Sequence, residues 1–487
     1  MSVPLKILFI SAEVAPFAKV GGLADVAGSL PKELVARGHE VRVLMPGYGM
    51  ILGDPSRETV PACADFPVKL NGSNVLASLH QFEYHGLSIW LLNGGGLFDT
   101  VQSSAEVYSP GRDAYLFFAS AALRACRATG WIPDVVHCND WHTGFIPVLM
   151  REMDPRSWET SASVFTIHNL AYQGEFGNDT LDAIGLPQSL FNPDQLETYG
   201  SVNFLKSGAV YADQVNTVSP TYAQEIQTPE FGCRLEGLMK YLAEEDKLSG
   251  ILNGIDYDFF NPEIDDAIAK NYSASKTDGK SACRDALLEE LGLSLKASQP
   301  ILGMVTRLSN QKGFDLVLEA APRILGSGAC LIVQGLGDPW AASGLQELEA
   351  SYPNSVRFIE KFDPDIAQRI YAGSDMFLMP SAFEPCGLGQ MIAMRYGTLP
   401  IVRRTGGLAD TVFEGVNGFV FESKNSEELI LATGRAIKSF EEKAQWETLV
   451  ARAMEIDHSW TKSAETYESL YVKALDLRRA KPLAATG

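Results

Sequence analysis

The chain of 487 residues lacks any hydrophobic run long enough to cross a membrane, and its first apolar stretch, ILFI, is too short for the core of a secretory signal peptide. It also has little positive charge: 40 Lys and Arg against 60 Asp and Glu give a formal net charge of −20. Proteins that bind nucleic acid through their overall charge show the opposite balance. We therefore expect neither a membrane nor a nucleic acid as partner.

Cysteine is scarce as well. The seven cysteines are an odd number, and no two of them have a metal-ligand spacing such as C-x-x-C. This pattern argues against a disulfide framework and against a structural metal site. We expect reduced thiols in a cytoplasmic protein, and no metal.

Length and composition describe an ordinary globular protein. Hydrophobic residues make up 46% of the chain and charged residues 21%, which excludes a disordered or collagen-like chain. At roughly 150 residues per domain, there is room for two or three domains. The chain can therefore bury large cores and form a cleft between domains.

The first half of the chain alternates between predicted strands and helices. An apolar run at 5–10 is followed by a glycine-bearing loop, a helical stretch that stops at Gly38, and a second strand at 41–44. Pro31 inside the helical stretch predicts a kink or a restart of the helix. The later strands are predicted at 87–92, 135–137, 164–167 and 214–217, with helices at 114–128 and 202–212 among those between them.

The second half repeats this alternation. Its strands are predicted at 301–306, 330–333, 356–359, 376–379, 399–402 and 418–421, with helices such as 314–324 and 365–371. Strands that alternate with helices form mostly parallel sheets. The fold class is therefore α/β, with two doubly wound domains joined near 248–254. We expect the polar stretch 265–281 to be a surface insertion and the chain from Glu427 onwards to be helical.

Two segments, 19–26 and 404–411, share the five residues GGLAD. Each stands where a strand should end and a helix begin, and Lys19 and Arg404 add positive charge beside them. A Gly-Gly turn lets backbone N–H groups approach an anion or a sugar hydroxyl closely. Paired glycines are also common at ordinary turns, so similar turns can arise by chance. We favour the functional interpretation, in which two comparable halves each approach a ligand; the first copy has neither a P-loop nor a dinucleotide-binding fingerprint.

Polar residues follow three of the predicted strands in the first half. Ligands of open parallel sheets bind beyond the carboxyl ends of the strands. Polar residues at these positions are therefore stronger candidates for a binding role than polar residues elsewhere. Any one of these residues could instead cap a helix or be a hydrogen-bonded residue of the core. We interpret His137 as such a core residue. Together they predict a binding rim made of Lys19, Asp140, His142, His168 and Asn169.

The second half supplies cations and a carboxylate at equivalent places. Arg307 and Lys312 follow a strand in a glycine-containing loop, where two fixed cations could hold a diphosphate leaving group. Glu384 also follows a strand and could grip sugar hydroxyls or offset oxocarbenium charge, or simply cap a helix. Cys386 has no base beside it in sequence and is predicted to be a packed thiol.

Eight segments in order along nearly the whole chain resemble bacterial glycogen synthases and plant starch synthases. They are KVGGLADV (19–26), HCNDWHTG (137–144), FTIHNLAYQG (165–174), YADQVNTVSPTYAQEI (211–226), ILNGID (251–256), TRLSNQKG (306–313), FEPCGL (383–388) and RYGTLPIVRRTGGLADTV (395–412).

The resemblance implies the GT-B fold, in which two Rossmann-like domains face each other across a cleft. It implies an acceptor-side domain at 1–250, a donor-side domain at 251–460 and a helix at 461–487 that returns to the first domain. The implied reaction moves glucose from ADP-glucose to the non-reducing end of an α-1,4-glucan, such as a maltooligosaccharide, glycogen or starch, with retention of configuration. No metal and no cofactor are implied, because ADP-glucose is a co-substrate that leaves as ADP.

The resemblance also implies roles for individual residues. Arg307 and Lys312 would bind the diphosphate, His168 would contact the donor glucose, and Glu384 would hold its hydroxyls; these four are the expected catalytic residues. Phe362 lies in the segment expected to stack on adenine. The expected substrate-binding residues are Lys19, Gly21, Gly22, Asp25, Asp140, Asn169, Asn253, Phe362, Cys386, Gly387, Leu388, Thr405, Gly406, Gly407 and Leu408.

Four positions depart from the family pattern. Ala382 stands where Arg is frequent, Gly389 where Thr or Ser is usual, Phe362 where Tyr is frequent and Arg234 where Gly is frequent. The changes leave the expected catalytic residues in place. Two alternatives to the ADP-glucose enzyme therefore stay open: a relative that uses UDP-glucose, and a weakly catalytic glucan-binding paralogue.

Overall fold

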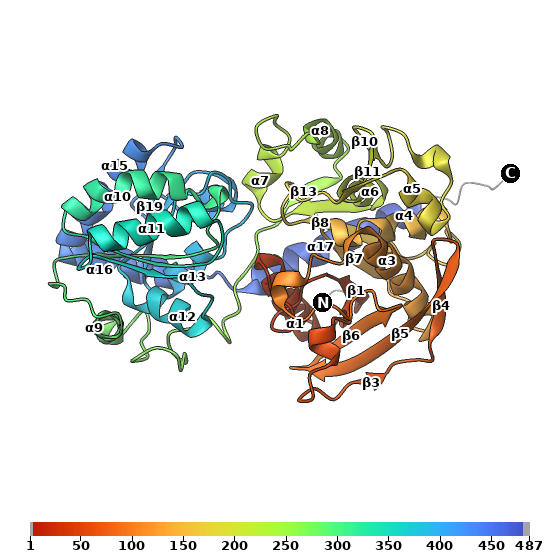
Figure 1. Ribbon diagram of the computed structural model, residues 1–487, viewed down its shortest axis with the longest axis horizontal. Helices are drawn as coiled ribbons and strands as arrows, with labels where there is room; N and C mark the ends of the chain where they lie inside the picture. Colours follow the sequence, from red (N-terminus) through yellow and green to blue (C-terminus); the bar gives the residue numbers. More distant parts are fainter. Residues whose placement is uncertain (1–2, 481–487) are drawn as a thin grey trace. The chain divides into compact units, whose positions relative to one another are not determined.

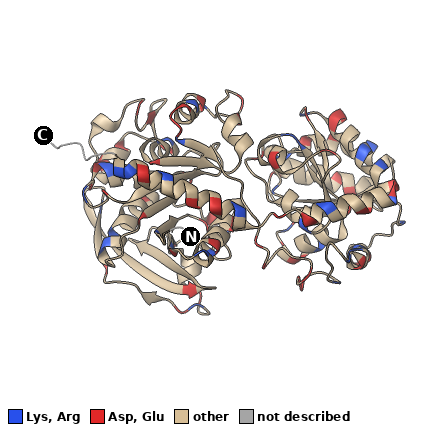
Figure 2. Ribbon diagram, turned by 180° about the vertical axis from the view of Figure 1, so that it is seen from behind, with Lys and Arg blue, Asp and Glu red and all other residues tan. Residues whose placement is uncertain are grey.

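The computed structural model describes residues 3–480, which form two compact units (Figure 1). The first unit contains the chain up to Gly254 together with the chain from Trp460 onwards, and the second unit is Ile255–Ser459. None of the helices in the described part of the chain combines the length and the apolar character needed to span a bilayer. Asp and Glu are spread over the helices of both units (Figure 2).

A mixed sheet organises the first unit. Its path runs β13-β12-β8-β7-β1-β2-β6-β5-β3, with β4 paired to β5, so it has ten strands among the residues described. The strands from β13 to β6 are parallel, and β5, β3 and β4 are antiparallel additions at one edge. The bounds are β1 (Lys6–Ile10), β2 (Glu40–Pro46), β3 (Val60–Pro61), β4 (Phe66–Leu70), β5 (Ser73–Tyr84), β6 (Leu87–Gly94), β7 (Val135–Asn139), β8 (Ala162–Ile167), β12 (Gln214–Thr217) and β13 (Leu248–Gly250).

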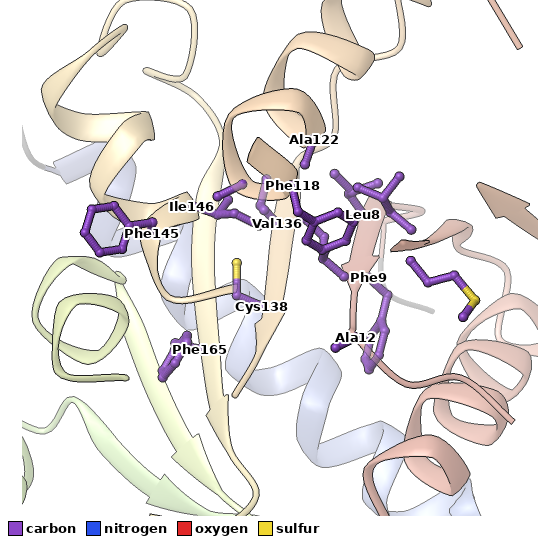
Figure 3. Close-up of a cluster of buried hydrophobic side chains, with 14 of the residues drawn as sticks. Leu8, Phe9, Ala12, Phe118, Ala122, Val136, Cys138, Phe145, Ile146 and Phe165 are labelled. Carbon is purple, nitrogen blue, oxygen red and sulfur yellow. The ribbon is translucent and has the colours of Figure 1, made fainter. Parts of the chain in front are cut away.

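Helices bury both faces of this sheet, which is why its central strands read as continuous apolar runs. In Figure 3, Phe118 and Ala122 lie beside Leu8 and Val136, so a helix side chain and a strand side chain share one core. The α-helices of the unit are α1 (Gly22–Ala36), α2 (Gly49–Leu52), α3 (Gly111–Ala128), α4 (Phe145–Glu152), α5 (Asp179–Ile184), α6 (Phe204–Tyr211), α7 (Pro220–Glu225), α8 (Glu236–Glu244) and α17 (Trp460–Ala480). Short elements complete it: β9 (Glu175–Phe176), β10 (Glu197–Thr198), β11 (Ser201–Asn203), η1 (Ser104–Glu106), η2 (Trp141–Thr143) and η3 (Gln188–Leu190).

The last helix, α17, is attached to the sheet of the first unit by a buried polar network. His137 contacts the hydroxyl of Tyr471 at 2.8 Å through Nδ1 and Oγ1 of Thr166 at 2.7 Å through Nε2. The Thr166 hydroxyl donates to Asn216, whose amide donates to Tyr467 of the same helix. His137 is therefore a satisfied core residue, as the sequence predicted, and burial lowers its pKa to about 3.

A parallel six-stranded sheet organises the second unit, with the order β16-β15-β14-β17-β18-β19 among the described residues. Its strands are β14 (Ile301–Val305), β15 (Cys330–Gln334), β16 (Val356–Ile359), β17 (Met376–Met379), β18 (Leu399–Arg403) and β19 (Phe419–Phe421). Its helices are α9 (Asp278–Glu290), α10 (Phe314–Gly326), α11 (Pro339–Ser351), α12 (Pro364–Gly373), α13 (Gly389–Arg395), α14 (Gly406–Thr411), α15 (Ser426–Glu441) and α16 (Lys443–Glu455), with η4 (Asn310–Lys312) before α10.

Two expectations need correction, and one needs an addition. Helix α1 does not restart at Pro31, which lies inside one helix. The stretch 265–281 is not simply a surface insertion, because Asp265 and Tyr272 are buried and hydrogen-bond the side chain and the carbonyl of Tyr396. The first sheet is mostly parallel, as predicted, but the segment 60–84 adds an antiparallel edge that the sequence did not predict.

The two GGLAD copies stand at different places in their sheets. The first opens α1, the helix after the first strand of its sheet, and the second opens α14, the helix after the fifth strand of its sheet. Both copies do begin a helix, as predicted. They are not equivalent positions of two duplicated halves, so the shared residues do not support that part of the interpretation.

Candidate active-site residues

Each sheet has one point at which the strand order reverses. Counted in chain order, the parallel strands follow the pattern 3-2-1-4-5-6-7 in the first sheet and 3-2-1-4-5-6 in the second, and the reversal lies between β1 and β7 in the first unit and between β14 and β17 in the second. Ligands of doubly wound folds bind beyond the carboxyl ends of the strands at this reversal. The loops after these four strands carry the charged candidate residues Lys19, Asp140, Arg307, Lys312 and Glu384.

The loop after β1 is shaped by the buried carboxylate of Glu13. One of its oxygens accepts hydrogen bonds from the N–H groups of Val20 (2.5 Å) and Gly21 (2.8 Å). The ammonium of Lys19 pairs with Asp25 of α1 at 2.6 Å. The Gly21 N–H that the sequence suggested for a ligand therefore already has a partner within the loop.

The carboxyl ends of β7 and β8 bring Asp140 and His168 together. A carboxylate oxygen of Asp140 accepts from the backbone N–H of His168 at 2.7 Å, and the Nε2 atom of His168 lies 2.9 Å from the amide oxygen of Asn139. Asp140 has a φ of 55°, a conformation in which non-glycine residues are uncommon. Two neighbouring residues thus hold the backbone and the ring of one histidine.

Burial sets the charge of these groups. It raises the pKa of Asp140 to about 7, an effect that the nearby charge of Glu13 reinforces and the N–H of His168 opposes. Burial lowers the pKa of His168 to about 3. The imidazole is therefore neutral near pH 7, while Asp140 is poised between its two forms.

The remaining first-unit candidates occupy different environments. His142 is buried against the rings of Tyr108 and Trp141, and neither ring nitrogen has a hydrogen-bond partner among the residues described. Asn169 accepts from the N–H of Ala171, which makes it a local turn residue in part. Asn253 is buried, and its side-chain oxygen also has no partner within the described chain.

The second unit joins its cation and its carboxylate in one contact. The ammonium of Lys312, in the loop after β14, lies 2.5 Å from Glu384, in the loop after β17. The same carboxylate oxygen accepts from the hydroxyl of Ser381 at 3.0 Å. Arg307 is exposed and forms no ion pair within residues 3–480. One paired and one unpaired cation therefore lie beside the strand reversal.

The turn that opens α14 packs tightly against the loop of Glu384. The N–H of Gly407 donates to the carbonyl of Glu384 at 3.1 Å. A Cβ at Gly406, which has a φ of 44°, would lie 1.9 Å from that carbonyl oxygen, and one at Gly407 would lie 2.2 Å from the carbonyl of Cys386. Only glycine fits at either place, so 383–388 and 405–408 form one packed surface.

Other second-unit predictions are placed as follows. Cys386 is buried, as a packed thiol should be, Gly387 has a φ of 73°, and Leu388 precedes α13. Phe362 is 71% exposed, which makes it accessible for stacking. Arg404, which was expected to add positive charge beside the second glycine turn, is exposed and pairs with Glu422.

Sequence reasoning missed three residues that hold the candidates in place: Glu13, Asn139 and Ser381. Of the three, only Glu13 could have been recognised from the sequence, because a carboxylate that closely follows a buried strand needs hydrogen-bond donors. Asn139 lies within the segment HCNDWHTG, where its charged neighbour Asp140 is the more obvious functional candidate. Among residues 3–480, no group of three or more His, Cys, Asp or Glu side chains has an arrangement that could hold a metal ion.

Comparison with known proteins agrees with the fold and the motifs. The family model described as the starch synthase catalytic domain matches residues 6–241, and the model described as glycosyl transferases group 1 matches residues 292–448. With two Rossmann-like units, the protein is a glycosyltransferase of the GT-B class, as the sequence predicted.

Close relatives refine this class. A glycogen synthase of Desulforudis audaxviator is 43% identical, with 97% of each chain covered, and one of Moorella thermoacetica is 42% identical, with 99% of each covered. The chain belongs to the family of glycogen and starch synthases. The catalytic domain of starch synthase IV from Arabidopsis thaliana, solved with ADP and acarbose, matches with a TM-score of 0.91 and 34% identity over 97% of this chain and 100% of that one. Sucrose-phosphate synthase from Thermosynechococcus elongatus shares only the fold, with a TM-score of 0.62 and 18% identity over 97% of this chain and 99% of that one.

Proposed function

We propose that this protein transfers glucose from ADP-glucose to the non-reducing end of an α-1,4-glucan with retention of configuration. The observation that carries the proposal is the group of Arg307, Lys312 and Glu384 at the strand reversal of the second sheet. The family supports glucosyl transfer to a glucan, and the Arabidopsis relative that binds ADP supports the choice of nucleotide. ADP-glucose and a maltooligosaccharide, glycogen or starch are thus the proposed partners.

In this proposal the second unit handles the donor. Breaking the glycosidic C–O bond moves negative charge onto the diphosphate, and a cation that meets this charge stabilises the transition state more than the ground state. Arg307 is available for this role because no described acid pairs with it. Lys312 would keep its orientation through Glu384, whose carboxylate would also offset positive charge that develops on the sugar ring. Phe362 would stack on adenine.

The first unit would contact sugar. His168 is neutral and held from β7, so it can form directed hydrogen bonds without adding charge. Asp140 would lie on the acceptor side, and Lys19 would approach the donor phosphate once it exchanges its contact with Asp25 for the ligand. Asn253, with its unpartnered side-chain oxygen, would contact the donor glucose.

We also propose that the reaction needs neither a metal nor a cofactor, since fixed cations can do the work of a metal on a diphosphate. A cytoplasmic location would suit the seven cysteines, which are all free thiols.

The test is a donor comparison with purified protein, a maltooligosaccharide primer and a chelator. We expect ADP-glucose to extend the primer by glucose units with stoichiometric release of ADP, and UDP-glucose to be used more slowly. Turnover with UDP-glucose alone would overturn the choice of donor. Glucan binding without release of either nucleotide would favour the weakly catalytic paralogue, which the departures at Ala382 and Gly389 keep under consideration.

A further inference from the structure

Asn139, the last residue of β7, is fully buried between the end of β1 and the ring of His168. Its Nδ2 atom lies 3.0 Å from the carbonyl oxygen of Ile10 and 3.5 Å from that of His137. Its Oδ1 atom lies 2.9 Å from Nε2 of His168. The side chain thus bridges the first strand of the sheet to the histidine of the candidate site.

These contacts fix which way the Asn139 amide points. Both atoms near its Nδ2 are carbonyl oxygens, which can only accept hydrogen bonds. An amide turned by 180° would place its own oxygen against them and lose the donor that satisfies Ile10. The amide oxygen therefore faces His168.

The orientation of the amide in turn fixes the protonation of His168. The Oδ1 atom of Asn139 only accepts, so Nε2 of His168 has to carry the hydrogen that it donates. Burial keeps the imidazole neutral, with a pKa of about 3. A neutral imidazole with hydrogen on Nε2 has a bare Nδ1, and no residue in the described chain hydrogen-bonds that atom.

We infer that Asn139 is a positioning residue that holds His168 with a hydrogen-bond acceptor at Nδ1, so that this nitrogen binds a sugar hydroxyl and not a phosphate oxygen. The choice follows from chemistry, because a hydroxyl can donate to a bare nitrogen whereas an ionised phosphate oxygen only accepts. The assignment rests on the proposed function, since it takes the sugar to be the ligand beside His168.

The first test measures the tautomer directly. With nitrogen-15 label in histidine, two-bond proton–nitrogen NMR correlations distinguish the tautomers, and His168→Gln identifies the signal of His168. We expect hydrogen on Nε2 alone from pH 6 to pH 9 in the unmodified protein. Hydrogen on Nδ1, or a charged ring at pH 7, would overturn the assignment. This measurement needs no activity, so it is independent of the proposed function, and it needs no variant of Asn139.

The second test asks whether Asn139 acts through His168. Asn139→Leu should lower kcat/KM for the nucleotide sugar about tenfold in the native background, the effect of losing one directed hydrogen bond. In a His168→Ala background the same substitution should change kcat/KM less than about twofold, because the residue it positions is gone. Equal losses in both backgrounds would overturn the proposal.

Asn216→Leu is the matched control. Asn216 is equally buried, lies in β12 of the same sheet, and bonds Thr166 and Tyr467 but not His168. Like Asn139→Leu, it should lower the melting temperature. Unlike Asn139→Leu, it should change neither the tautomer of His168 nor the loss of activity that follows when a deoxy-glucose donor replaces the normal donor. Asn139→Leu should instead reduce the penalty for the one deoxy-glucose donor that lacks the hydroxyl facing Nδ1. If both variants alter that penalty alike, Asn139 has only a structural role. Failure of the proposed function would look different, because the unmodified protein would then use no nucleotide sugar at all.

Discussion

The loop after β1 in the first unit and the loop after β14 in the second unit hold the same position in their sheets, and each places a lysine just before a helix. They differ in how that lysine is held. Lys19 pairs with Asp25, six residues further along and on the helix that the loop opens, and its side chain is 35% exposed. Lys312 pairs with Glu384, which comes from the next strand of the sheet, and its side chain is 16% exposed.

This difference has an energetic consequence. An ion pair between partly exposed groups contributes at most about 1 kcal/mol, whereas removing one partner of a buried pair leaves an uncompensated charge and costs about 3–5 kcal/mol. The lysine of the first unit can therefore exchange its partner for a ligand at small cost. The lysine of the second unit is fixed, as the proposed electrostatic stabilisation of a leaving group requires.

The largest expected effect is the loss of the second-unit carboxylate. Glu384→Gln should lower kcat by about 100- to 1000-fold, the range seen when one preorganised electrostatic contact is removed, because the variant neither orients Lys312 nor offsets positive charge on the sugar. The matched substitution in the first unit, Asp25→Asn, should cost less than about tenfold. Steady-state kinetics with the nucleotide sugar varied gives both numbers. Similar losses in the two variants would break the distinction between the two loops.

The two GGLAD copies give the next comparison, which concerns stability. Gly406→Ala should reduce the free energy of unfolding by about 2–4 kcal/mol, because φ is 44° and the new Cβ would meet the carbonyl of Glu384. Gly21→Ala should change it by less than about 1 kcal/mol, since φ is −146° and the Cβ would have no atom within 4 Å. Denaturant unfolding of the two variants measures the contrast. A stable Gly406→Ala protein would show that the two loops do not pack together as described.

The smallest effect is one of pH and belongs to the first unit. Burial raises the pKa of Asp140 to about 7, above its ordinary value near 3.9, so its contribution to stability is fully present below pH 4 and is lost as the pH rises through 7. Asp140→Asn removes this dependence. The stability of the variant relative to the native protein should therefore increase between pH 4 and pH 8 by a few kcal/mol at most. A relative stability that falls over this range, in denaturant unfolding at a series of pH values, would mean that Asp140 is ionised in the folded protein.

The parallel strands and their helices could be predicted because each is a contiguous apolar run with a glycine or proline turn beside it. The edge formed by β3, β4 and β5 was missed because its alternating residues belong to strands that are buried on one face only. At Pro31 the sequence predicted a kink or a restart of the helix. The structure excludes the restart, because α1 continues through Pro31 as one helix in which Pro31 itself is buried.

The candidate residues could be named from their places at strand ends, but their partners could not. The contact between Lys312 and Glu384 joins positions 72 residues apart and depends on β14 lying beside β17, an order that no local pattern encodes. The orientation of Asn139 depends on a carbonyl of β1 that lies 129 residues away. A shared local motif can also suggest more than the structure supports. The GGLAD copies suggested equivalent positions in two comparable halves, whereas the sheet order places them after different strands, β1 and β18.

The most direct test of the account is a crystal structure of the protein with ADP and a maltooligosaccharide. The account predicts that the ADP phosphates contact Arg307 and Lys312, that adenine stacks on Phe362, and that His168 contacts a sugar hydroxyl through Nδ1. ADP bound away from the strand reversal of the second sheet, with Arg307 and Lys312 both free of phosphate, would contradict it.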